Sequence, residues 1–168
     1  MAGDSTLSID DGWLDVAGAK LEYRRWRPVG VSSHGSAWVL LHEGLGCVET
    51  WRDFPAALAR HSRSDVYAYS RAGYGRSSTI ALPRRVDFME REALDVLPEV
   101  LRGLGLDSPH LLGHSDGGTI ALLAAAQGTV PFATVTALAA HVFNEPMCKA
   151  AIENTGNMFA QGPLREAL

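Results

Sequence analysis

Four apolar runs without polar alternation, separated by stretches of helical character, set the strongest limit on how this chain can fold. A strand that shows no alternation is buried on both faces, as the strands of parallel sheets are. Strands that alternate with helices build a mainly parallel sheet with helices on both faces. The sequence therefore predicts an α/β fold of this kind. The four runs are Ala37–Leu41, Val66–Tyr69, Leu111–Leu112 and Val135–Ala140.

Helical spacing is clearest in residues 87–106, where leucines recur every three or four positions. Pro98 lies inside this segment and should kink or split the helix, because proline lacks an N–H and clashes with the preceding turn. An alanine-rich helix is expected over residues 117–127, directly after the third apolar run.

The segment before the first apolar run predicts a β-hairpin. Residues 13–26 contain two short strand-like stretches around Ala17-Gly18-Ala19. In the second stretch Leu21 and Tyr23 alternate with Glu22 and Arg24, as in a half-exposed strand. We therefore expect the charged side chains of this strand on its exposed face.

Bulk properties place the chain among ordinary globular proteins. Its 168 residues suffice for one domain with a sizeable core. The formal net charge of −4 gives no electrostatic reason to expect nucleic acid or an anionic membrane as a partner. The apolar runs are too short to span a bilayer, and the N-terminus does not resemble a signal peptide. Cys47 and Cys148 form no Cys-x-x-Cys pair, which argues against a disulfide scaffold or a zinc site. These features predict a cytoplasmic protein without a metal.

The strongest candidate for a catalytic motif is Gly113-His114-Ser115-Asp116-Gly117, a Gly-x-Ser-x-Gly motif at a strand-to-helix junction. In that context the motif is typical of a nucleophile elbow, a tight turn that lifts a serine hydroxyl clear of the sheet. Such a backbone costs about 1–3 kcal/mol of strain, so its surroundings must enforce it. Gly113 and Gly117 lack a Cβ, which lets strand and helix approach closely. The helix that begins at Gly117 would aim its free N–H groups at the site, where an oxyanion would form.

Other readings of this glycine-rich turn are weaker. Such a loop can merely pack against its neighbours or hold a phosphate, but its placement between a strand and a helix favours the elbow. A nucleotide-binding domain is excluded because no G-x-G-x-x-G opens a helix after the first buried strand and no G-x-x-x-x-G-K-[ST] occurs. The sequence predicts no cofactor.

A second glycine-bearing segment, His42-Glu43-Gly44-Leu45-Gly46, directly follows the first apolar run. Together with the elbow it resembles the α/β-hydrolase family, whose members commonly have a His-Gly-x-x-Gly-like loop here. The resemblance implies an oxyanion hole formed by the backbone N–H groups of Gly44 and Asp116, each worth about 2.7–4 kcal/mol to the transition state. Glu43 departs from the family's usual glycine, and we expect its carboxylate to point away or be hydrogen-bonded. We expect His42 to hold the loop rather than act as the base, which follows the nucleophile in this fold.

Further matches extend the resemblance to about residues 12–145. Arg71–Ser77 resembles the family's turn after the second buried strand, and residues 97–106 resemble the helix that leads to the elbow. The family places its catalytic acid and histidine after the nucleophile, on loops that follow later strands. Here His141 is the only later histidine, and no acid-bearing strand precedes it. The resemblance therefore implies that His141 lines a pocket or is structural, and that the triad acid and histidine are missing.

The same resemblance divides the chain. Residues 1–145 would form a partial hydrolase core, and residues 146–168 would begin a lid or form a C-terminal helical tail. The last two strands of the family's sheet have no counterpart, so the strand predicted at 135–140 would have an exposed edge. That segment has no Lys, Pro or charge, and an unpaired strand edge is a template for another chain. We therefore expect self-association through this edge.

The sequence thus favours a serine hydrolase that acts on an ester or related acyl bond of a small-molecule substrate, with Ser115 as the nucleophile. This chain alone is expected to be nearly inactive, because serine without a base is a poor nucleophile. The alternative is a non-catalytic module of the same fold that binds a small molecule or a partner, since a fold does not imply a function. An acidic residue and then a histidine encoded beyond codon 168 would favour the hydrolase.

Overall fold

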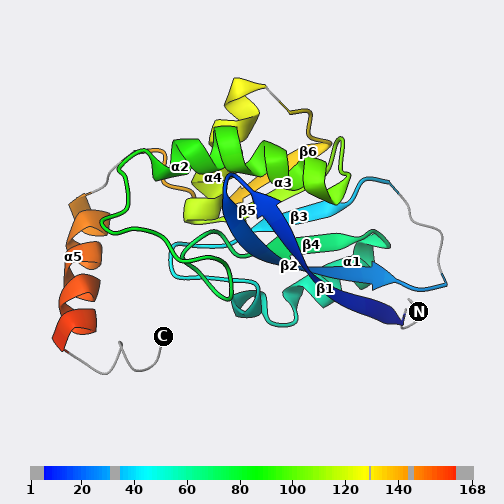
Figure 1. The fold of residues 1–168 in the computed structure, drawn as a ribbon, viewed down its shortest axis with the longest axis horizontal. Helices are drawn as coiled ribbons and strands as arrows, with labels where there is room; N and C mark the ends of the chain where they lie inside the picture. Colours follow the sequence, from blue (N-terminus) through cyan, green and yellow to red (C-terminus); the bar gives the residue numbers. More distant parts are fainter. Residues whose placement is uncertain (1–5, 31–34, 129, 144–145, 162–168) are drawn as a thin grey trace.

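Six strands form one sheet in the computed structural model, which describes residues 6–30, 35–128, 130–143 and 146–161 (Figure 1). The strand order is β1-β2-β4-β3-β5-β6. β2 pairs antiparallel with β1 and β4, and all other neighbours are parallel. The predicted mainly parallel sheet is therefore confirmed. The strands are β1 (Leu7–Val16), β2 (Ala19–Pro28), β3 (Trp38–Leu41), β4 (Val66–Tyr69), β5 (His110–His114) and β6 (Thr134–Leu138).

Helices cover both faces of the sheet, which explains the unbroken apolar runs. Successive residues of β3 point to opposite faces: Val39 and Leu41 belong to one buried cluster, and Leu40 belongs to the other. Residues of α3 and α4 complete the first cluster, and residues of α1 complete the second. Figure 1 shows α2, α3 and α4 above the sheet and α1 below it. The helices are α1 (Phe54–Ser62), α2 (Phe88–Arg91), α3 (Leu97–Leu104), α4 (Asp116–Gln127) and α5 (Pro146–Gln161), with a 3-10 helix at Glu49–Trp51.

The β1–β2 hairpin turns where the sequence predicts, but its strands are longer than residues 13–26. Val16 pairs with Ala19 across a two-residue turn in which Ala17 (φ 49°) and Gly18 (φ 78°) are both left-handed. This geometry matches the right-handed twist of the two strands. The pairing continues to Leu7 and Pro28, so the hairpin forms a long flap beside β4.

The helix expected over residues 87–106 is not split at Pro98. α2 and α3 are joined by a π-helical turn, Glu92–Val96, and the backbone at both junctions is helical. Pro98 lies at the first turn of α3, where its missing N–H leaves no hydrogen bond of α3 unmade. The wider turn directly before it accommodates the proline ring within a continuous helix.

The last strand is shorter than predicted. β6 ends at Leu138, and Ala139 adopts φ 50°, so Ala139 and Ala140 lie outside the strand that we expected over 135–140. β6 is the terminal strand of the described sheet, where its only neighbour is β5. Leu138 is 45% exposed. The exposed edge, which residues 134–138 form, therefore remains the feature behind the predicted self-association.

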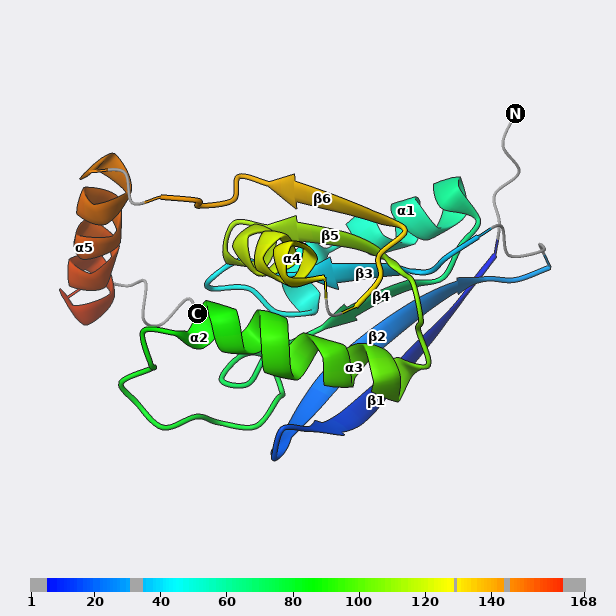
Figure 2. The same cartoon turned by 90° about the horizontal axis from the view of Figure 1, so that it is seen from above.

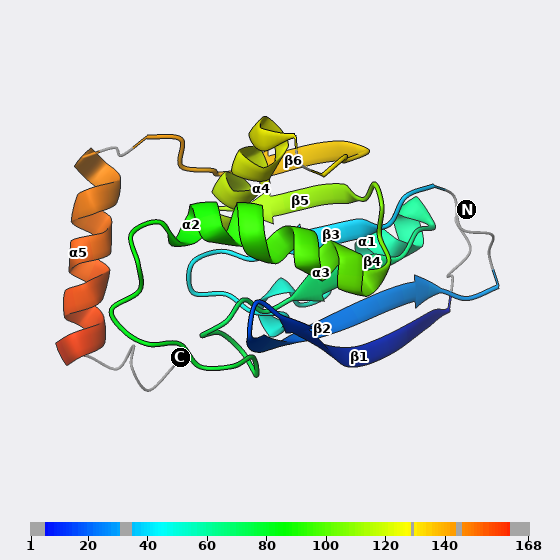
Figure 3. The same cartoon turned by 45° about the horizontal axis from the view of Figure 1, so that its top comes forward.

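α5 lies in the segment 146–168, for which the sequence predicts the start of a lid or a helical tail, and residues 162–168 of this segment lie outside the described residues. Figures 1 and 3 show it standing apart from the sheet, and its residues 149–158 are exposed. Whether it begins a lid or forms a tail stays a prediction. Within the described ranges, no helix combines the length and apolarity that crossing a bilayer requires.

Candidate functional site

Ser115 lies between β5 and α4, at the strand-to-helix turn where the sequence predicts it. Its backbone angles, φ 52° and ψ −116°, are rarely adopted by a residue with a side chain, and such a conformation costs about 1–3 kcal/mol. The Ser115 N–H donates to the Leu138 carbonyl (2.8 Å), and the Thr119 N–H donates to the Ser115 carbonyl (3.0 Å). The end of β6 and the first turn of α4 thus hold the strained turn. Figure 2 shows β5 and β6 ending side by side there.

The two glycines of the motif allow this turn to form. A Cβ on Gly113 would overlap the backbone oxygen of Gly117, and a Cβ on Gly117 would overlap the backbone oxygen of Leu41. Strand, turn and helix therefore pack backbone against backbone, as the motif predicts. Because Leu41 ends β3, the same contact fixes α4 against the start of the His42–Gly46 loop.

The structure brings the two predicted oxyanion donors together. A Cβ on Gly44 would lie 2.8 Å from Oδ2 of Asp116, so the loop after β3 touches the first residue of α4. Both residues are only partly buried. That their N–H groups bind an oxyanion stays a prediction.

Two buried side chains fix the peptide bond between Glu43 and Gly44. Arg71, which is 1% exposed, donates from Nη1 to the His42 carbonyl (2.6 Å) and from Nη2 to the Glu43 carbonyl (3.0 Å). Nδ1 of His42 lies 2.7 Å from the same Glu43 carbonyl. In a planar trans peptide the N–H points opposite to the carbonyl. Pinning the Glu43 oxygen therefore fixes the direction of the Gly44 N–H.

His42 holds the loop, as expected, and is not a base. The ring is fully buried, and its Nε2 accepts the Arg71 backbone N–H (3.1 Å), which leaves Nδ1 as the protonated nitrogen that donates to Glu43. Burial, with a smaller contribution from the Arg71 charge, lowers the pKa of His42 to about 3. The imidazole is therefore neutral at pH 7, with both nitrogens engaged.

A buried carboxylate anchors the turn that carries Arg71. Glu22 is 2% exposed, although the alternation of β2 predicts it on the exposed face. Its carboxylate accepts from the Ser70 hydroxyl (2.7 Å) and from the Arg76 backbone N–H (2.9 Å) and Nε (2.5 Å). These bonds lower the pKa of Glu22 despite its burial. The polar turn 70–77 covers this face of β2. The alternation of residues within β2 cannot predict that a distant segment packs over Glu22.

The Glu43 side chain lies against Gly46 and near the elbow. A Cβ on Gly46 would lie 2.5 Å from the Glu43 carboxyl carbon, so the side chain folds back over Gly46. Its Oε2 lies 3.8 Å from Nδ1 of His114, the residue before Ser115. This contact is too long for a hydrogen bond, so the expectation that the Glu43 carboxylate points away or is hydrogen-bonded stays a prediction.

His141 lies closer to Ser115 than the sequence indicates. Its Nε2 is 3.4 Å from the Ser115 Oγ. The Thr119 hydroxyl holds the histidine backbone, since it donates to the His141 carbonyl (3.0 Å) and accepts the His141 N–H (3.0 Å). His141 is exposed, which fits a residue at the wall of a site better than a structural one. Among the described residues, no group of three or more His, Cys, Asp or Glu side chains is arranged to hold a metal ion.

Comparison with known proteins matches this architecture. A family model described as alpha/beta hydrolase fold matches residues 37–161. Human serine hydrolase BPHL is 34% identical over 122 residues, which are 71% of this chain and 39% of that protein. A proline iminopeptidase of Lactobacillus delbrueckii subsp. lactis is 32% identical over 114 residues, which are 66% of this chain and 39% of that protein.

A solved structure agrees in fold. The crystal structure of a Mycobacterium smegmatis proline iminopeptidase superposes with a TM-score of 0.71 at 21% identity, covering 92% of this chain and 50% of that one. The chain therefore spans about two fifths of the length of the curated relatives named here and half of this structural neighbour.

Proposed function

Because the chain belongs to the α/β-hydrolase fold family, we propose that it carries the nucleophile half of a serine hydrolase, with Ser115 attacking an ester or related acyl bond. One observation carries the proposal: Ser115 is held in a strained left-handed conformation at the start of α4, next to the pinned Gly44 loop. Strain of this kind persists where function requires it. Relatives named as a serine hydrolase and an iminopeptidase are consistent with this class of chemistry.

The chemical step follows from this arrangement. The Ser115 Oγ forms a bond to the carbonyl carbon of the substrate and gives its proton to a base. The carbonyl oxygen becomes an oxyanion that accepts hydrogen bonds from the Gly44 and Asp116 N–H groups. The bond to the leaving group then breaks, the leaving group takes a proton, and an acyl group remains on Ser115 until water hydrolyses it.

The acid and the histidine of a full triad are not assigned to this chain, so its own turnover should be slow. Loss of any triad member typically leaves about 10³–10⁴-fold acceleration over water. Nε2 of His141 is the imidazole nitrogen seen next to Ser115, and it supports slow acylation in this chain without replacing the missing partners.

The test is acylation of the 168-residue chain by p-nitrophenyl acetate, followed by release of nitrophenol and by mass spectrometry of the digested protein. We expect up to one acetyl group per chain, located on Ser115, and a slow steady state. Ser115→Ala should abolish the acetylated peptide, whereas Ser8→Ala, at a partly exposed serine of the edge strand β1, should leave it. Equal acetylation of the Ser115→Ala chain would contradict the proposal.

The alternative proposal is a non-catalytic module that keeps the fold and binds a small molecule or a partner. It predicts no acetylation at Ser115 under the same conditions. The backbone strain at Ser115 favours the hydrolase, because a binding module has no need of a strained serine at this turn.

We further propose that the chain self-associates through the free edge of β6. Val135, Thr136 and Ala137 are partly buried, Leu138 is exposed, and no charged residue blunts the strand. Light scattering at micromolar concentration should show dimers or larger species, and Thr136→Lys should shift them toward monomer. A monomer in both cases would contradict the proposal.

A further inference from the structure

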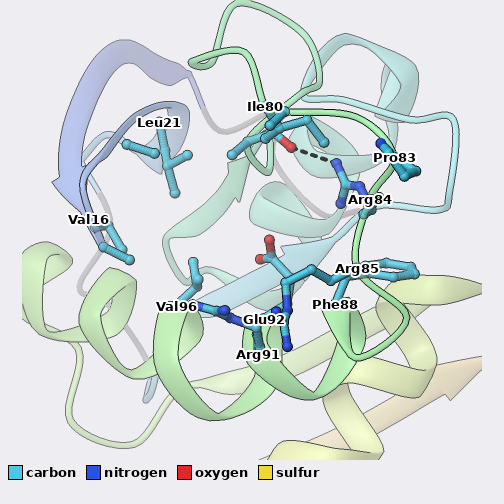
Figure 4. A pocket seen from close by; sticks show the side chains of 14 residues that line it. Val16, Leu21, Ile80, Pro83, Arg84, Arg85, Phe88, Arg91, Glu92 and Val96 are labelled. Carbon is cyan, nitrogen blue, oxygen red and sulfur yellow. Dashed lines mark hydrogen bonds between the residues drawn. The ribbon is translucent and has the colours of Figure 1, made fainter.

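A second concave site lies away from Ser115, between the β1–β2 hairpin, the loop after β4 and the α2–α3 helix. It is a cavity of about 360 Å³, within the range of sites that hold small molecules. Its walls are mainly apolar (Figure 4). Neither Ser115 nor Gly44 nor His141 lines it. The apolar lining residues include Val16, Leu21, Ile80, Pro83, Phe88 and Val96.

Glu92 supplies a buried acid to this cavity. It is 8% exposed, and Figure 4 shows its carboxylate directed toward the middle of the lining side chains. Its Oε2 is fully buried and has no hydrogen-bond partner within the described part of the chain. A buried polar atom of this kind is unfavourable unless something pairs with it. Glu92 also begins the π-helical turn, and such turns are frequent at functional sites.

Arg84 faces the cavity from the loop after β4. Its Nη2 donates to the Ala72 carbonyl (2.8 Å), and its guanidinium stacks on the rings of Tyr74 and Phe88. These contacts hold the cation in place without neutralising it, because no carboxylate pairs with Arg84 within the ranges that the structure describes. Arg84 and Glu92 interact electrostatically but form no ion pair within 4.0 Å.

We propose that this cavity binds an amphiphilic monocarboxylate, whose apolar tail fills the space between Leu21, Phe88 and Val96 and whose carboxylate sits between Arg84 and Glu92. One carboxylate oxygen accepts from the Arg84 guanidinium. The other accepts the proton of a neutral Glu92, so that the partly exposed Arg84 and the buried Glu92 both become paired.

Charge distinguishes this ligand from a cation or a neutral molecule. Three arginines line the cavity, Arg84, Arg85 and Arg91, against the single acid. Arg85 pairs with Asp87 and Arg91 lies near Asp95, and both arginines are more than half exposed. The unneutralised cation is therefore Arg84, which repels an ammonium group and attracts a carboxylate.

The protonation of Glu92 adds a pH dependence. Burial raises the pKa of Glu92, while the charges of Arg71 and Arg84 act in the opposite direction. The buried Tyr69 also faces it, and Arg85 and Arg91 lie at the edge of the cavity. Because a neutral Glu92 donates to the ligand and an ionised one repels it, affinity should rise as the pH falls toward the raised pKa of Glu92.

The experiment compares three probes with the same tail, octanoate, octanol and octylamine, by calorimetry or ligand-observed NMR on the 168-residue chain. We expect octanoate to bind at least tenfold more tightly than either of the others. Octylamine binding as tightly as octanoate would overturn the proposal, as would binding of none of the three.

Variants locate the site. Arg84→Gln should weaken octanoate at least tenfold, and the matched control Arg85→Gln should change it less than twofold. Glu92→Gln keeps a donor at every pH, so octanoate binding should persist and lose its pH dependence. Ser115→Ala should leave binding unchanged, since the proposal does not depend on the proposed function. Octanoate binding that is insensitive to Arg84→Gln, or lost in Ser115→Ala, would contradict the assignment.

Discussion

Two segments reach Ser115 from opposite sides, and they are built differently. The loop after β3 rests on fully buried side chains, His42 and Arg71, which bind its carbonyl groups. The segment after β6 is exposed, and the hydroxyl of Thr119 holds His141 there. The difference shows that the proposed oxyanion side is preorganised within this chain, whereas the histidine side rests on few bonds.

The paired glycines at the start of α4 provide the sharpest test of this difference. A Cβ on Gly117 would overlap the Leu41 oxygen on the β3 side, whereas a Cβ on Gly118 meets Ala140 at 3.1 Å and the Leu138 oxygen at 3.2 Å on the β6 side. We expect Gly117→Ala to lower the free energy of unfolding by more than about 4 kcal/mol. Gly118→Ala should cost less than about 1.5 kcal/mol, since alanine's helix propensity offsets part of the crowding. Urea denaturation measures both, and equal losses would remove the distinction between the two sides.

Substitutions that remove hydrogen bonds test the same difference between the β3 side and the β6 side, with smaller expected losses of stability. Arg71→Met leaves the His42 carbonyl without a donor and the Glu43 carbonyl with the His42 ring as its remaining donor. We expect a loss of about 1–3 kcal/mol in the free energy of unfolding. The matched change on the other side, Thr119→Val, removes one exposed hydroxyl and should cost less than about 1 kcal/mol. If thermal and urea unfolding show Thr119→Val to be as damaging as Arg71→Met, the β6 side is as firmly held as the β3 side.

Acid should weaken the β3 side selectively, because the pKa of His42 is about 3 in the fold against 6.5 for the unperturbed group. Between these values the unfolded chain binds more protons than the folded one, so stability is complete above pH 6.5 and falls as the pH falls toward 3. His42 alone gives a slope of about 1.4 kcal/mol per pH unit. His42→Asn should flatten this part of the stability profile measured by urea unfolding at pH 7, 6, 5 and 4. An unchanged profile would mean that His42 does not govern the acid response.

Much of the fold could be predicted from the sequence, because a strand that is buried on both faces is an unbroken run of apolar residues. Val39, Leu40 and Leu41 are each at most 1% exposed, so no polar residue interrupts the run. The helix is not split at Pro98, and the sequence could not show this, since proline chemistry forbids one hydrogen bond but does not say whether a π-turn will absorb the change. The end of β6 was also missed, because alanine at 139 carries no signal of its left-handed backbone.

The site was predictable where a motif fixes backbone geometry and not where the fold brings distant side chains together. Ser115, Gly113 and Gly117 are defined by local spacing. Arg71 meets the loop after β3 across 28 or 29 positions of sequence, and Glu22 meets the turn 70–77 across about 50. His141 was expected to line a pocket or to be structural, because its distance from the Ser115 hydroxyl depends on where the chain goes after β6.

The bonds made by Glu22 have a consequence for where this unit can be divided. The family model begins at residue 37, yet the turn that presents Arg71 is bonded to a carboxylate at position 22. The β1–β2 hairpin therefore stabilises, through Glu22 and Arg71, the loop 42–46. The smallest fragment of this protein that keeps this loop in place includes β2. The boundary indicated by sequence similarity therefore lies at residue 37, whereas the boundary indicated by the hydrogen bonds of Glu22 lies before β2.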